Sequence, residues 1–201
     1  PSCRSLHPNL NPMGNPSLRT LAILALILAA AASRVIPHPY NFSPIGAIAL
    51  FGAACFNRTV LAVLVPLAAV WISDIWLNNF VYNQHYQAFT LFDQGWYWMY
   101  GTYAAIAVLG LFTLKRISAP RIIGSSLAAS VIFFLVTNLA CWPGSAIYPQ
   151  DAGGLLMCYA AGLPFFSGTL LGDLFYSGVL FGGFALLQQR FPALRAVQAQ
   201  R

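Results

Sequence analysis

Two acidic residues lie inside long apolar stretches of the sequence, where a charged side chain needs a particular environment. These acids are Asp74 and Asp173, and the amide of Asn138 lies near the end of a third such stretch. Ionisable groups in apolar, membrane-like segments are costly, and they usually face a cavity or pair with another polar group. Each acid therefore binds a ligand or stabilises the fold, by capping a helix or by pairing with Arg34. The sequence alone leaves both roles open.

The segment Asn78–Gly95 joins two apolar stretches and mixes aromatic rings with amides and an imidazole. Flat rings and amides together suit the capture of a large, ring-bearing ligand. A long loop in a small domain is also more often functional than idle. We predict a lid made of four residues: Tyr82, His85, Tyr86 and Trp96. The alternative is an aromatic belt at a membrane surface, which applies to the tryptophans in particular.

A third group of polar residues follows the first apolar stretch. Together with the groups above, these residues complete a predicted ligand-binding set: His38, Tyr40, Asn41, Asp74, Tyr82, His85, Tyr86, Trp96, Asn138 and Asp173. For His38 and His85 the alternative is a plain interfacial position, because histidine combines an apolar body with a polar tip.

The sequence shows no signature of catalysis or of a resident metal. It has no phosphate-binding glycine loop, no G-x-S-x-G and no H-E-x-x-H, and its four cysteines lack zinc-ligand spacing. With no Glu and three His, acid–base chemistry would depend on four Asp. We therefore predict a protein that is not an enzyme, with no catalytic or metal-binding residue of its own. Cys141 and Cys158 either form a disulfide or remain buried thiols.

The elements that position these groups must be membrane helices. Of 201 residues, 59% are hydrophobic and only 7% are charged, whereas a soluble domain carries about 25% charged residues. This composition excludes a soluble enzyme or nucleic-acid binder. The net charge of +6 does not indicate DNA binding, because no basic stripe accompanies it. We predict an all-α integral membrane bundle that partners the lipid bilayer and no nucleic acid.

The apolar stretches predict six transmembrane helices. A span needs about 20 residues, and four stretches qualify: Leu18–Ile36, Thr59–Leu77, Trp96–Leu114 and Ile122–Trp142. Leu155–Leu187 is too long for one span, so we expect Pro164 to divide it into a short outer segment and a span from Phe165. Pro44–Cys55 is short and is either a short helix or a re-entrant one. The predicted layout is a disordered segment 1–17, one transmembrane domain 18–187 and a cytoplasmic tail 188–201.

The basic residues predict the orientation. With six spans and a cytoplasmic N-terminus, one base, Arg34, falls outside and nine fall inside: Arg4, Arg19, Arg58, Lys115, Arg116, Arg121, Arg190, Arg195 and Arg201. Omitting the short second span makes the split slightly less one-sided. We predict a bacterial cytoplasmic (inner) membrane protein with both termini in the cytoplasm. An alternative for the first stretch is a secretory signal cleaved near Ala30–Ala32.

Small residues form seams on two of the predicted helices. Ala25 and Ala29 have the spacing of a contact face on the first helix, and Gly168-x-x-x-Gly172 and Gly178-x-x-x-Gly182 have that of close helix packing.

Four segments resemble a known group of proteins: Arg34–Gly52, Pro66–Asp74, Phe133–Asn138 and Pro164–Phe175. They resemble a family of small bacterial membrane proteins related to the substrate-binding S-components of energy-coupling-factor (ECF) transporters. The similarity runs from about Leu18 to Leu187. The nearest characterised relatives by this resemblance are the solitary cobalamin transporters.

The resemblance implies a six-helix bundle that binds a vitamin in an outward-facing pocket, formed by the loops 37–43, 78–95 and 143–154 and the outer halves of the later helices. Ala25 and Ala29 would contact the shared subunit of an ECF-type energising module. Cobalamin is the leading ligand it implies. The cobalamin transporters, however, place a cobalt-binding cysteine in the third loop, and this sequence has none there. His85 is the candidate axial ligand in its place, and Cys141 or Cys158 is another candidate.

We therefore predict membrane-embedded binding and uptake of a small molecule, a vitamin or cofactor precursor. Without a nucleotide-binding loop, the chain either borrows an energising module or works alone. The alternative is a non-catalytic accessory or assembly subunit of a larger membrane complex. Third comes a membrane enzyme that acts on a bound corrinoid.

Overall fold

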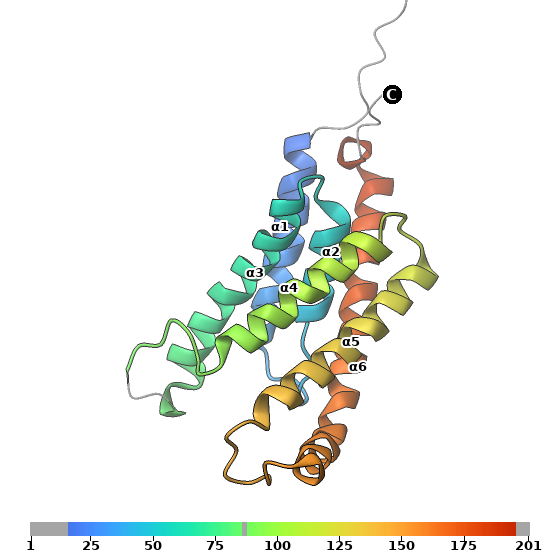
Figure 1. Cartoon of the computed structure of the whole chain (residues 1–201). Helices are drawn as coiled ribbons and strands as arrows, with labels where there is room; N and C mark the ends of the chain where they lie inside the picture. The colour runs from blue at the N-terminus through green and yellow to red at the C-terminus, as the bar shows by residue number, and fades with distance from the viewer. Residues whose placement is uncertain (1–15, 86–87, 196–201) are drawn as a thin grey trace, which may run out of the picture.

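The computed structural model describes residues 16–85 and 88–195, and this part of the chain is a bundle of helices without strands (Figure 1). Its six α-helices are α1 Pro16–Ala32, α2 Ile45–Cys55, α3 Thr59–Trp76, α4 Trp96–Thr113, α5 Ala119–Cys141 and α6 Ala152–Arg190. Short helical turns lie at Ser33–Val35, Asn83–His85 and Pro192–Leu194, and a π-helical turn, Leu77–Val81, prolongs α3. The predicted all-α membrane bundle of six helices, with a short second one, is confirmed.

Four segments are long and apolar enough to cross a membrane: Leu18–Val35, Thr59–Val81, Ala119–Cys141 and Ala152–Arg190. Helix α4 was predicted as a span but is not among them. Its first turns, from Trp96 to Tyr103, are dominated by tryptophan and tyrosine, which are more polar than the aliphatic residues that follow. This end of α4 has the composition of a membrane interface.

Helix α2 is the centre of the bundle, although it is the shortest of the six. It contacts each of the other five helices, and every residue in it except Ala54 is buried. A helix that is apolar on all sides belongs in a protein interior. The short segment is therefore a core helix enclosed by the longer ones.

Side chains from other helices cap both ends of α2. Its N-cap residue is Pro44, which makes no side-chain capping bond, and the Asp173 carboxylate instead accepts from the backbone N–H groups of Gly46 and Ala47. At the other end, the Arg19 guanidinium donates to the Cys55 carbonyl oxygen at 3.1 Å. The anionic group lies at the N-terminus and the cationic one at the C-terminus, as the helix dipole favours.

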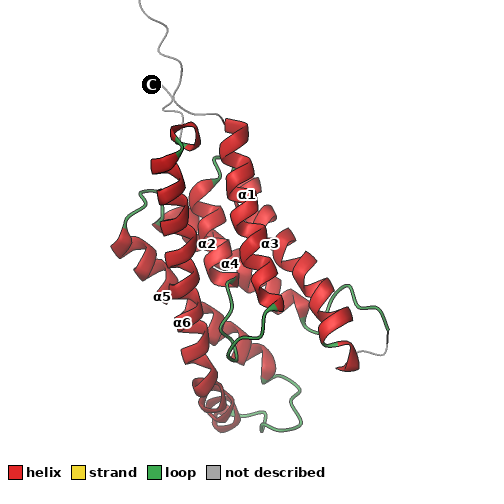
Figure 2. Ribbon diagram, turned by 180° about the vertical axis from the view of Figure 1, so that it is seen from behind, coloured by secondary structure: helices red, strands yellow, loops and turns green. Residues whose placement is uncertain are grey.

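Helix α6 runs through Pro164 without a break, so the predicted division into two segments is wrong. Proline inside a helix removes one helical hydrogen bond and can bend the helix without ending it. Figures 1 and 2 show the first turns of α6 nearly end-on and the remainder lengthwise, so the helix bends. Asp151 begins the helix, because its side chain accepts from the Gly154 N–H at 2.8 Å.

The segment that follows α6, within the predicted tail 188–201, packs on the bundle. The helix continues to Arg190, and the turn Pro192–Leu194 packs against α1. Leu194 is buried, and its carbonyl accepts from Arg19 at 3.3 Å. The tail is therefore attached to the bundle up to this turn, while residues 1–15 and 196–201 lie outside the described part of the chain.

The two ends of the bundle differ in charge. One end of the bundle, the upper end in Figure 1, contains the starts of α1 and α5, the α2–α3 and α4–α5 loops, the end of α6 and the turn that follows it. In the described part of the chain, every base except Arg34 belongs to these segments: Arg19, Arg58, Lys115, Arg116, Arg121, Arg190 and Arg195. We call this the basic end. The three remaining loops lie at the opposite end.

Candidate ligand-binding site

A cavity of about 560 Å³ lies between the helices toward the end opposite the basic end. The 11 residues of α2 span about 16 Å at 1.5 Å per residue, roughly half of a 30 Å hydrocarbon core. The bundle centre beyond the start of α2 is thus left without a helix, and the cavity lies there. Its lining residues are Arg34, Val35, Ile36, Pro37, His38, Pro39, Tyr40, Asn41, Ser43, Ile45, Gly46, Leu77, Val81, Tyr82, Met99, Tyr103, Ile106, Phe133, Thr169 and Asp173.

One wall of the cavity is an irregular segment, residues 36–43, which we call the strap. It joins α1 to α2 and lies in the middle of the bundle's lower half in Figure 2. Two glycines of α6 let it approach closely: a Cβ on Gly168 would lie 2.1 Å from the Tyr40 carbonyl oxygen, and one on Gly172 would lie 2.7 Å from the Ser43 nitrogen. This glycine pair therefore packs against a loop, where the spacing had suggested another helix.

Arg34 fixes the start of the strap to α3. Its Nη1 lies 2.7 Å from the Asp74 Oδ1 in an ion pair, and it also donates to the Ser73 hydroxyl. The second Asp74 oxygen accepts from the Tyr100 hydroxyl of α4 at 2.5 Å. Pairing with Arg34 was one of the two roles open for Asp74, and Asp74 does not line the cavity.

Asp173 borders the cavity where α2 begins. It is 3% exposed, and besides its two bonds to the start of α2 it accepts from the Ser130 hydroxyl of α5 at 2.7 Å. Gly46 makes the contact possible, because a Cβ there would lie 2.2 Å from the Asp173 Oδ1. Asp173 thus caps a helix, as one alternative held, and also presents a carboxylate to the cavity.

Five residues of the cavity wall have hydroxyl groups that make no hydrogen bond to any described residue: Tyr40, Ser43, Tyr82, Tyr103 and Thr169. Tyr40 and Tyr82 are exposed. The Ser43 Oγ is fully buried, whereas Tyr103 as a whole is 4% exposed and its hydroxyl is not among the fully buried atoms. Buried polar groups in native proteins almost always have a partner. The Tyr103 and Thr169 hydroxyls are not fully buried, so a molecule in the cavity could reach them.

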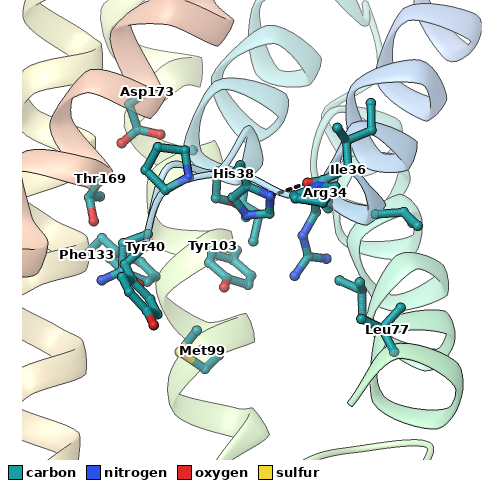
Figure 3. Close-up of a pocket in the computed structure, with 18 of the residues that line it drawn as sticks. Arg34, Ile36, His38, Tyr40, Leu77, Met99, Tyr103, Phe133, Thr169 and Asp173 are labelled. Atoms are coloured by element: carbon teal, nitrogen blue, oxygen red, sulfur yellow. Dashed lines mark hydrogen bonds between the residues drawn. The ribbon is translucent and has the colours of Figure 1, made fainter. Parts of the chain in front are cut away.

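The opposite wall is apolar and partly aromatic. Met99, Tyr103 and Ile106 come from one face of α4, and the Tyr103 ring lies parallel to the Phe133 ring of α5, with 3° between the planes and 6.0 Å between centroids. Figure 3 shows Tyr103 facing the cavity above Met99. Flat walls of this kind suit a planar ligand.

His38 of the strap lines the cavity and is near the centre of the view in Figure 3. Its Nδ1 is 2.6 Å from the Ile36 carbonyl oxygen. Because a carbonyl can only accept, Nδ1 is the donor and Nε2 has no partner among the described residues.

A smaller cavity of about 190 Å³ adjoins the first between α5 and α6. The two share Asn41, Phe133 and Thr169 as lining residues. Asn138 lines this second cavity, and its side-chain nitrogen donates to the Phe134 carbonyl at 2.8 Å.

The structure distributes the predicted ligand-binding residues over several places. The main cavity is lined by five of them: His38, Tyr40, Asn41, Tyr82 and Asp173. Trp96 lines neither cavity. Phe92, Tyr97 and Tyr100 surround its ring at centroid distances of 4.8–6.3 Å, so it is held in an aromatic cluster at the start of α4. The His85 side chain and the whole of Tyr86 lie outside the described residues.

The other predicted groups are also located. Ala25 and Ala29 are exposed on α1, so they are accessible as a contact face. Cys55, Cys141 and Cys158 are free thiols; Cys158 is buried, whereas Cys141 is exposed, unlike the buried thiol expected. In the described part of the chain no cluster of His, Cys and Asp has the form of a metal site.

The prediction missed several cavity residues: Ser43, Met99, Tyr103, Ile106 and Thr169. Met99, Tyr103 and Ile106 follow the i, i+4, i+7 spacing of one helix face, so the sequence did carry a signal for a shared surface on α4. Ser43 and Thr169 line the same cavity because the strap packs closely against α6, and no local pattern reveals that contact.

The profile of a protein family matches residues 15–194 of the chain, and its description is "Family of unknown function (DUF6580)". No curated protein and no solved structure matches the chain.

Proposed function

The chain belongs to the DUF6580 family of unknown function, and from its own geometry we propose that it binds a small, ring-bearing molecule in the main cavity and mediates its uptake across the membrane. The ligand we propose is a vitamin or cofactor precursor. The cavity would receive it from the side of the membrane opposite the basic end.

One observation carries this proposal: a cavity of about 560 Å³ whose wall contains the hydroxyls of Tyr103 and Thr169, neither of which has a partner among the described residues. Small-molecule sites typically measure about 300–1,000 Å³ and have mostly apolar walls with a few polar groups. An unsatisfied buried hydroxyl costs about 1–3 kcal/mol. A ligand that excludes water from the cavity must therefore bond to the Tyr103 and Thr169 hydroxyls to avoid this cost.

The charge distribution supports the direction. Basic residues near membrane helices are most frequent on the cytoplasmic side, and all described bases except Arg34 belong to the basic end. The cavity would then open outward from a bacterial inner membrane. The exposed Ala25 and Ala29 on α1 are where an energising subunit would bind.

The cavity volume favours a ligand smaller than cobalamin, which was the ligand that the resemblance implied. Cobalamin is a substituted macrocycle with a nucleotide tail, and as a whole it is larger than a cavity of about 560 Å³. We propose a vitamin of one or two rings. If a corrinoid bound in this cavity, the free Nε2 of His38 would be the candidate axial ligand, because His38 lines the cavity and no described cysteine does.

The test is a calorimetric titration of the detergent-purified protein with a panel of vitamins, cobalamin included. Met99→Trp places a larger side chain in the cavity and should weaken binding at least tenfold. Val108→Trp is the matched control, because Val108 lies on the same helix but is 44% exposed and lines neither cavity. If no vitamin binds and another membrane subunit co-purifies stably, the protein is an accessory subunit and the uptake proposal is wrong.

A further inference from the structure

The main cavity has a charged group on each of two opposite sides. Arg34, which follows α1, is on one side, and Asp173 of α6 is on the other. Figure 3 shows them apart, with His38 and Tyr103 between them. Both residues line the cavity, and each has hydrogen-bonding capacity that the described residues leave unused.

Arg34 uses only one of its three nitrogens. Its contacts with Val70, Ser73 and Asp74 all involve Nη1. A guanidinium has five N–H donors, so Nε and Nη2 keep donors that no described residue accepts. These nitrogens are not among the fully buried atoms, and a ligand in the cavity can approach them. The fork geometry of a guanidinium suits a carboxylate or another planar acceptor.

Asp173 has hydrogen-bond partners but no cation. Its three donors are the Ser130 hydroxyl and the N–H groups of Gly46 and Ala47, all of them uncharged. A carboxylate has about four acceptor positions, which leaves one for a ligand. In the described part of the chain the single ion pair is that of Arg34 with Asp74, so Asp173 has no counter-ion there. Buried charges in proteins are normally paired.

Between these two sides the cavity is lined by rings and apolar side chains. The parallel rings of Tyr103 and Phe133 form one wall, and the hydroxyls of Tyr103 and Thr169 are available for bonds to a ligand. A molecule that extends from Arg34 to Asp173 must therefore carry an apolar, planar middle.

We infer that the ligand is a dipolar ring compound, with an acidic or acceptor group at the Arg34 side and an amine or similar donor at the Asp173 side. The inference rests on the proposed function and specifies the chemical class of its ligand. A ligand with only one of the two groups leaves either Arg34 or Asp173 unsatisfied inside a largely apolar site, which lowers its affinity.

Three matched probes test this inference by calorimetry. They share one benzene ring: para-(aminomethyl)benzoate has both groups, para-methylbenzylamine only the amine, and para-methylbenzoate only the carboxylate. We expect the first to bind about tenfold more tightly than either of the others, since one added charge-assisted contact is worth about that factor. Equal affinities of the three probes would overturn the inference and leave the proposed function intact.

Variants then assign the two sides. In Asp173→Asn the dipolar probe should bind only as tightly as the carboxylate probe does. In the double variant Arg34→Gln, Asp74→Asn, which removes the ion pair as a unit, it should bind only as tightly as the amine probe. Asp93→Asn is the control, because Asp93 is an exposed acid that does not line the cavity, and it should leave the order of the probes unchanged.

Every outcome is decisive. If the Asp173→Asn protein does not fold, the order of the three probes on the wild-type protein still decides the inference. Binding of a vitamin without binding of any probe overturns the inference alone. Binding of neither overturns the proposed function as well. If both variants still prefer the dipolar probe, residues other than Arg34 and Asp173 bind its charged groups, and the assignment of the two sides is wrong.

Discussion

The carboxylate of Asp173 satisfies the first turn of α2, a helix whose own N-cap residue, Pro44, makes no capping bond. The sequence indicated that an acid in an apolar helix must face the interior, and capping was one of two roles it left open. The partner was beyond prediction, because Gly46 and Asp173 are far apart in the chain and meet only through tertiary packing. The Arg34–Asp74 pair, by contrast, was among the alternatives from the start.

Replacing Gly46 by alanine should destabilise the protein. The new Cβ would lie 2.2 Å from the Asp173 Oδ1, so the carboxylate must move and release the N–H groups it caps. Losing a cap costs about 1–2 kcal/mol, which should lower the melting temperature in detergent by several degrees. Gly178→Ala is the matched control: nothing lies within 4 Å of its Cβ position, so it should be neutral or slightly stabilising. Equal melting temperatures for the two variants would contradict the capping role of Asp173.

Tyr100→Phe should weaken the contacts of Asp74, which pairs with Arg34 at the start of the strap. It removes the hydroxyl that donates to Asp74 at 2.5 Å and with it about 1.5–3 kcal/mol, the usual contribution of a hydrogen bond to a charged group. Chemical or thermal unfolding measures the change. Tyr97→Phe provides the comparison, because Tyr97 is 60% exposed and its hydroxyl has no partner among the described residues. A loss of stability in Tyr97→Phe as large as that in Tyr100→Phe would refute the assigned role.

At the scale of elements, the helices could be predicted well and the strap could not. The short length of α2 was clear from its sequence. Its residues are apolar on all sides, which is consistent with a core position, but hydropathy alone does not distinguish a core helix from a lipid-facing helix. The effect of Pro164 was mispredicted: α6 was expected to divide there, but the helix continues through it. Proline bends a long helix when the neighbouring turns hold it on both sides. The strap has no periodic pattern, and its position depends on the contacts of Gly168 and Gly172 with its backbone.

Gly168→Ala should weaken ligand binding more than it weakens the fold. A Cβ at this position would lie 2.1 Å from the Tyr40 carbonyl oxygen, which belongs to the wall of the cavity, so the strap must shift. We expect the affinity for a bound vitamin or probe to fall about tenfold, which corresponds to about 1.4 kcal/mol. Gly182→Ala on the same helix has no neighbour within 4 Å and should bind as the wild type does. Unchanged affinity in Gly168→Ala would show that the strap does not shape the site.

At the scale of the whole molecule, composition was the most informative property of the sequence. With 7% charged residues, the few that are present distinguish the two ends of the bundle, and the sequence showed this before the fold was known. It could not show that the centre of the bundle contains a cavity, because that follows from the length of α2 relative to its neighbours.

The proposed orientation can be tested with single cysteines in a Cys3→Ser, Cys141→Ala background. Ile147→Cys lies in the α5–α6 loop, where Ile147 is 80% exposed, and a membrane-impermeant maleimide should label it in intact cells. Arg116→Cys lies in the exposed α4–α5 loop at the basic end and should be labelled only after permeabilisation. The reverse pattern would place the basic end outside.

The half-length of α2 also has an electrical consequence. The part of the bundle occupied by α2 is filled by large side chains, with Phe51 against Phe181 and Phe184 at centroid distances of 5.3 and 5.6 Å, and all three are buried. A buried aromatic layer of this kind is a barrier to ions, since a charge is strongly disfavoured in an apolar medium. The cavity is therefore closed toward the basic end by a layer that ions do not cross. Proteoliposomes containing the protein should hold a membrane potential as well as empty ones do. If the protein mediates uptake as proposed, release of the ligand on the far side would require this aromatic layer to move.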